Sequence, residues 1–106
     1  MIKIKQYIAM NGSSPFEQWF LELNSLAAAK ITKAIYKLEL GNFSTVEGVG
    51  NGVYEQKIDF GPGYRVYFGE DGNEIVILLC GGTKKRQSND IEKAKEYWQD
   101  YKKRKK

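Results

Sequence analysis

Apolar and polar residues alternate at the start of the chain. Ile2, Ile4 and Ile8 are interleaved with lysines and a tyrosine, and Gln6 is the only interruption. A period of two is typical of a β-strand with one buried face. The pattern therefore predicts a short first strand.

Two helical patterns follow this strand. Ser14 begins a capping box, with a proline at the first helical position and Glu17 three residues after the cap. The apolar residues that recur behind it at i, i+3, i+4 and i+7 are Phe16, Trp19, Phe20 and Leu23. A second helix is expected to begin after Asn24 or Ser25 and to end at Gly41. Its apolar face consists of Ile31, Ala34, Ile35 and Leu38.

The middle of the chain has the pattern of an antiparallel meander. Residues 41–52 are rich in glycine and lack a core pattern of their own, which predicts a loop. Three strands are then predicted at 53–60, 64–69 and 74–80, and the short turns between them require antiparallel neighbours. The last of these strands is apolar on both faces, so we expect it to be central and covered on both sides.

The chain ends in an amphipathic pattern. Ser88 or Asp90 is expected to cap a last helix whose apolar stripe consists of Ile91, Ala94, Trp98 and Tyr101. The basic residues 102–106 are predicted to fray as a flexible tail. At this length the chain forms one domain, 1–106, of the α+β class.

Charge is distributed unevenly along the sequence. Residues 84–106 carry ten basic and four acidic residues, a net charge of +6, whereas the preceding residues carry seven basic and nine acidic, a net charge of −2. This asymmetry favours an acidic partner at the C-terminal end, with nucleic acid the commonest candidate. A solvated helix with a basic end is the simpler alternative.

Several classes of chemistry are excluded by composition. The single cysteine, Cys80, cannot form an intramolecular disulfide and lies in an apolar run, which favours a buried thiol. The chain contains no histidine, so a zinc site and histidine-dependent acid–base mechanisms are not expected. No apolar run has the length of a signal peptide or a membrane span, and we expect a cytoplasmic protein without membrane contact.

The candidate chemistry is concentrated around Arg65. In the strand 64–69, Arg65 and Tyr67 share the face opposite the apolar residues, so Arg65 is predicted to point away from the core. Glu55 or Lys57 of the preceding strand would lie beside it. An exposed ion pair between Glu55 and Arg65 is one interpretation. The other is a phosphate-binding site, since a guanidinium binds phosphate through two parallel hydrogen bonds.

A basic loop supports the second interpretation. The segment GGTKKRQ, residues 81–87, leaves the central strand, and its glycines would let a polynucleotide backbone approach closely. Tyr67 would either stack on a base or serve as an ordinary sheet aromatic. Gln87 would contact RNA or cap the last helix. Arg65 would then stabilise charge on a phosphate attacked by the neighbouring 2′-hydroxyl.

Taken together, GVYEQKIDFGPGYRVYF, ILLCGGTKKRQSNDIEKAKEYW and the basic end resemble the RelE/ParE superfamily of type II toxin-antitoxin toxins, in particular the HigB-like addiction module killer proteins. The resemblance extends over nearly the whole chain. It implies a RelE-like α+β fold, a curved antiparallel sheet of about four strands with two N-terminal helices and a C-terminal helix. It also implies growth inhibition by ribosome-dependent mRNA cleavage (an mRNA interferase) without metal or cofactor.

The resemblance also suggests roles and partners. By position, Arg65 matches the arginine that contacts the scissile phosphate, Lys57 the basic residue one strand earlier, and Lys84 the start of the basic loop. RNA contacts are expected from Lys85, Arg86, Tyr67 and Gln87. The implied partners are a cognate antitoxin and mRNA on the ribosome, with DNA bound only through an antitoxin complex.

Two other functions are compatible with the same residues. The superfamily includes ParE-like gyrase poisons, which keep the fold without cleaving RNA, because fold does not fix activity. A basic nucleic-acid-binding module without catalysis is the third hypothesis.

Overall fold

The computed structural model describes residues 1–105, and in this range it has an α+β fold with one five-stranded sheet and three α-helices. The elements in chain order are β1 (Lys3–Gln6), α1 (Pro15–Leu21), α2 (Ser25–Glu39), β2 (Val46–Gly50), β3 (Val53–Ile58), β4 (Tyr64–Asp71), β5 (Ile75–Thr83), the 3₁₀ turn η1 (Lys84–Arg86) and α3 (Gln87–Lys105).

The sheet has the strand order β1-β5-β4-β3-β2. The strands β2 to β5 are antiparallel to their neighbours, as the short turns predicted, whereas β1 pairs in parallel with β5. The expectation of about four antiparallel strands was therefore wrong in two respects, since the sheet is mixed and has a fifth strand in residues 1–105. That strand, β2, lies in the segment predicted to be a loop. Its two apolar residues, Val46 and Val49, are three positions apart and pack on opposite faces, and the pairing is irregular between Gly48 and Gly50, so no period of two is visible.

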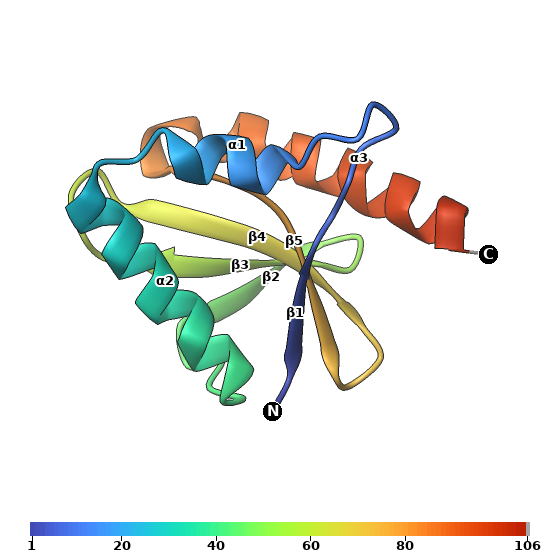
Figure 1. Cartoon of the computed structure of the whole chain (residues 1–106), viewed down its shortest axis with the longest axis horizontal. Helices are drawn as coiled ribbons and strands as arrows, with labels where there is room; N and C mark the ends of the chain where they lie inside the picture. Colours follow the sequence, from blue (N-terminus) through green and yellow to red (C-terminus); the bar gives the residue numbers. More distant parts are fainter. Residues whose placement is uncertain (106) are drawn as a thin grey trace.

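Both faces of the sheet are covered, and Figure 1 shows the strands between α2 and α3. On one face, α1 and α2 pack on residues that include Val66, Phe68 and Leu78. On the other, Ala94 and Trp98 of α3 pack on a second cluster that includes Tyr67. The internal strand β5 contributes to both clusters, as its apolar sequence predicted.

The helix starts confirm the capping predictions for α1 and α2. The Oγ of Ser14 accepts a hydrogen bond from the Glu17 N–H at 3.1 Å, and the Oδ1 of Asn24 accepts one from the Ala27 N–H at 2.9 Å. Each cap satisfies a backbone donor that the first helical turn leaves free.

The last helix differs from its prediction at both ends. It begins at Gln87, directly after η1, rather than behind a cap at Ser88 or Asp90. The residues 102–105, predicted to fray, continue the helix to Lys105, and residue 106 lies outside the described part of the chain. None of the helices in residues 1–105 combines the length and the apolar character that crossing a membrane requires.

Candidate functional site

A buried polar cluster lies between the sheet and the start of α3. Its centre is an ion pair between Arg65 of β4 and Glu55 of β3, with 3.4 Å between Nε and Oε1. The Gln87 side chain, at the first residue of α3, donates a hydrogen bond from Nε2 to Oε2 of Glu55 at 2.6 Å. The Nη1 of Arg65 donates to its neighbour's backbone oxygen, that of Tyr64, at 3.2 Å. The guanidinium is thus held from two sides.

Strand register brings these side chains together. Arg65 is paired with Lys57 on β3 and with Gly82 on β5, and Glu55 is paired with Tyr67. Residues paired across antiparallel strands project on the same face, so Arg65 and Glu55 are diagonal neighbours on the face covered by α3.

Arg65 does not point away from the core. The residue is 9% exposed, because α3 covers the face that the sequence pattern marked as open. Glu55 is 1% exposed. The Glu55–Arg65 ion pair considered from the sequence is therefore present, but it is buried rather than solvent-exposed.

Tyr67 cannot serve as a stacking platform in this structure. Its exposure is 0%, with its ring in the α3-side cluster. Within the described chain, its hydroxyl is buried without a hydrogen-bond partner, and burial raises the pKa of that hydroxyl, helped by the negative charge of Glu55. Of the two interpretations of Tyr67, the structure supports the ordinary sheet aromatic, because base stacking requires an exposed ring face.

The basic loop lies beside the ion pair. Lys84, Lys85 and Arg86 form η1 and are all exposed. The Lys84 N–H donates to the Gly63 oxygen at 2.7 Å, which ties the loop to the β3–β4 turn. A side chain at Gly63 would meet the Lys84 Cβ at 3.3 Å and the Arg65 Nη1 at 3.6 Å. Arg65 and the stem of the Lys84 side chain therefore both lie against Gly63 in the turn.

The side chains of Lys57 and Gln87 each have a partner within the protein. Although Lys57 is paired with Arg65 in register, its Nζ binds Oε1 of Glu47 at 3.1 Å on the surface. Gln87 is half-buried and engaged with Glu55, so it orients the ion pair instead of presenting its amide to solvent.

Gly81 and Gly82 lie inside β5, near its end, rather than after it, and both are covered by side chains. A Cβ at Gly81 would lie 2.3 Å from the Trp19 ring, and one at Gly82 would lie 1.9 Å from Oδ2 of Asp90. These glycines are needed for internal packing, which corrects the expectation that they open the sheet to a polynucleotide backbone.

Asp90, predicted only as a helix cap, is a buried carboxyl group. It is 7% exposed, and within residues 1–105 its Oδ2 has no hydrogen-bond partner. Burial raises the pKa of Asp90, while the charges of Arg86 and Lys93 partly oppose the rise. The position of Glu55 near Arg65 could be predicted, because Glu55 shares a strand face with Lys57. No pattern in the sequence predicts that the Asp90 side chain lies against Gly82.

The arrangement is suited to binding an anion. A guanidinium fixed by Glu55, with 11% of its side chain exposed, lies beside a loop of three exposed cations. No three His, Cys, Asp or Glu side chains in the described range are grouped as metal ligands. Chemistry here would depend on positive charge and positioning.

Comparison with known proteins shows a clear relationship. The chain is 46% identical over 81 residues to a protein from Haemophilus influenzae named only as an uncharacterized protein, a match that spans 76% of this chain and 82% of that protein. The chain belongs to the family of this protein. No protein-family model matches the chain.

Proposed function

We propose that the chain is a toxin of the RelE/ParE superfamily with a RelE-like fold, in the HigB-like branch, and that it cleaves mRNA on the ribosome. The observation that carries the proposal is the position of Arg65, whose guanidinium is fixed by the buried Glu55 next to the exposed Lys84, Lys85 and Arg86. The five-stranded α+β architecture and the sequence motifs around Arg65 also support it.

The proposed reaction is transfer of a phosphodiester within the RNA. The ribose 2′-oxygen bonds to the adjacent phosphorus, the bond to the 5′-oxygen breaks, and a proton passes from the 2′-hydroxyl to a base while the 5′-oxygen gains one. Arg65 stabilises the charge that develops on the phosphoryl oxygens, and Lys84 adds a second positive charge. The neighbouring phosphates are bound by Lys85, Arg86 and Lys57, all of which are exposed.

The partners follow from the same proposal. We expect a cognate antitoxin whose acidic segment covers the basic loop. Opposite charges would speed the association of the two proteins, and the bound segment would prevent RNA from reaching the loop. Any binding to DNA would occur through the antitoxin complex. The site of action would be the cytoplasm, where ribosomes translate.

The test is primer extension on a defined mRNA, with and without programmed ribosomes. Arg65→Lys keeps a positive charge beside Glu55 but loses the planar fork that binds phosphate, so we expect cleavage to be lost while folding is retained. Lys3→Gln, which removes an exposed charge from β1, is the control and should cleave normally. Full cleavage by a folded Arg65→Lys variant would overturn the role of Arg65, and intact mRNA with wild-type protein would overturn the proposed activity.

A second candidate is a non-catalytic, ParE-like inhibitor that binds DNA gyrase through its helical face. A groove of about 830 Å³ lies between α1, α2 and β1, and Leu21 and Tyr36 on its rim are 74% and 52% exposed. Large exposed apolar residues favour a protein partner. DNA damage on expression, with mRNA intact, would support this candidate.

A further inference from the structure

A second cationic surface lies on the side of the sheet opposite the ion pair. Lys30, Lys33 and Lys37 of α2 line a cleft of about 600 Å³. Its other wall is formed by β3 with the following Asp59, by the segment before β2 and by the start of β2, where Glu47 is paired with Lys57. Their spacing of three and four residues places them on one face of the helix, over about 10 Å of its length. All three lysines are exposed.

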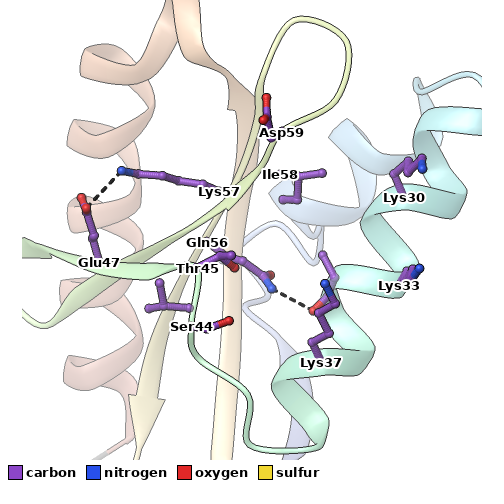
Figure 2. A pocket seen from close by; sticks show the side chains of 12 residues that line it. Lys30, Lys33, Lys37, Ser44, Thr45, Glu47, Gln56, Lys57, Ile58 and Asp59 are labelled. Atoms are coloured by element: carbon purple, nitrogen blue, oxygen red, sulfur yellow. Dashed lines mark hydrogen bonds and ion pairs between the residues drawn. The ribbon is translucent and has the colours of Figure 1, made fainter.

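The cleft has a fixed geometry. Gln56 of β3 is buried, and its Nε2 donates a hydrogen bond to the Ala34 oxygen at 2.8 Å, which ties the lysine-bearing helix to the sheet. Figure 2 shows this bond between the two walls and the lysines along α2. It also shows the Lys57 side chain directed away from α2, toward Glu47, so the positive charge of the cleft comes from the helix.

The cleft connects to the basic loop over the β3–β4 turn. The Lys30 ammonium lies 5.2 Å from the centre of the Phe60 ring, in that turn. The Gly63 N–H donates to the Phe60 oxygen, and the Gly63 oxygen accepts from the Lys84 N–H. Cations therefore flank the turn on both sides, with Lys30 on one and Lys84 on the other.

This layout fits an extended anion better than a compact one. A small phosphorylated ligand would be bound by one cluster of cations, whereas a polynucleotide presents phosphates at regular intervals and can contact both clusters. The exposed hydroxyls of Ser44 and Thr45 on the cleft wall could bond phosphate or ribose oxygens.

We propose that Lys30, Lys33 and Lys37 form a second RNA-binding surface, which holds RNA backbone outside the cleaved segment. The proposal rests on the proposed ribonuclease function. It adds a binding site that acts on affinity, whereas Arg65 acts on the chemical step.

The experiment measures fluorescence anisotropy with a labelled single-stranded RNA oligonucleotide carrying 2′-O-methyl groups, which cannot be cleaved by 2′-hydroxyl attack. The dissociation constant is measured over a series of salt concentrations for the wild type and for the Lys30→Gln/Lys33→Gln/Lys37→Gln variant. Each lost phosphate contact lowers the salt slope by about 0.7, so the triple variant should lose up to about 2 units of slope. We expect its affinity at low salt to fall at least about tenfold for the same reason.

The control is Lys3→Gln/Lys5→Gln, which removes two exposed charges of β1 away from both the cleft and the basic C-terminal segment. An equal loss in both variants, or no RNA binding by the wild type, would overturn the proposal. The Arg65→Lys variant should retain the part of the salt dependence of RNA binding that comes from the lysines of α2. Because the oligonucleotide cannot be cleaved, anisotropy tests RNA binding alone. Failure of the cleavage hypothesis would be seen in the primer-extension experiment and not in the anisotropy experiment.

Discussion

The buried ion pair offers a sharp test of how the site is held together. Glu55→Gln keeps the size of the side chain and its ability to hydrogen-bond Gln87, but removes the negative charge opposite Arg65. Because the two side chains are only 1% and 11% exposed, water cannot replace the lost partner. The substitution leaves a buried cation without a compensating charge, and this loss should destabilise the folded protein.

The expected effect is large for a domain of this size. Removing one partner of a buried pair costs about 3–5 kcal/mol, and we expect about 3 kcal/mol because the glutamine oxygen can still accept a hydrogen bond. With a urea m value of about 1.5 kcal/mol per M, the unfolding midpoint should fall by about 2 M. The second ion pair on the same strand is the control, since Lys57 and Glu47 are 41% and 65% exposed, and Glu47→Gln should cost less than about 1 kcal/mol.

The assay is urea unfolding followed by tryptophan fluorescence, for wild type, Glu55→Gln, Arg65→Met and the double variant. Each single variant leaves one charge buried alone, whereas the double variant leaves neither. We therefore expect the double variant to be more stable than the sum of the single effects predicts, by about 2 kcal/mol. A coupling free energy below about 0.5 kcal/mol, or an equal effect of Glu47→Gln, would refute the reasoning.

Three further predictions concern the packing under α3. Gly82→Ala would place a Cβ 1.9 Å from Asp90 and should lower the free energy of unfolding by about 2–3 kcal/mol. The control is Gly48→Ala, whose Cβ would lie 3.8 Å from Tyr54 and which should change that free energy by less than about 0.5 kcal/mol. Equal effects of the two substitutions in urea unfolding would contradict this prediction. Because burial raises the pKa of Asp90 in the folded state, ionisation of this carboxyl opposes folding, and the destabilisation grows as pH rises from the ordinary carboxyl pKa to the raised one. Asp90→Asn should therefore gain stability relative to wild type as pH rises above about 4, and a pH-independent difference would contradict the burial argument. Burial raises the pKa of Cys80 to about 12, so a disulfide reagent at neutral pH should modify the thiol in denaturant and not in the native protein; rapid native modification would show that the thiol is accessible.

Local patterns in the sequence were sufficient for the helices. Ser14 and Asn24 cap their helices because a side-chain oxygen can satisfy a first-turn donor whatever the rest of the fold does. The apolar composition of β5 likewise predicted an internal strand, since only burial on both faces accommodates it.

The sequence did not indicate which helices cover which face of the sheet. The stripe of α3 was recognised as apolar, but nothing local indicates that it covers the face carrying Arg65 and Tyr67. The parallel pairing of β1 with β5 also depends on residues far apart in the sequence, and the glycines and register shift of β2 leave no period-two pattern to recognise. Arg65 was therefore expected to be exposed, because it lies on the face of the strand opposite Tyr64, Val66 and Phe68, and the register that places Glu55 beside it was unknown.

In the proposed function, a buried Arg65 can still bind phosphate. Its burial gives it a different role from that of the exposed lysines. Within the described chain, its guanidinium donates a hydrogen bond from Nη1 to the Tyr64 oxygen, while its buried Nε faces Glu55 at 3.4 Å as an ion-pair contact without a hydrogen bond. The remaining N–H groups can bind a phosphate without breaking the ion pair. Such a group needs little reorganisation when charge develops on the phosphate, which favours the chemical step over binding. The lysines of η1 and α2 are exposed and free to adapt to the RNA backbone, so they should contribute mainly to affinity and to its salt dependence. On this argument, loss of Glu55 in a protein that still folds should reduce the rate of cleavage more than the affinity for RNA.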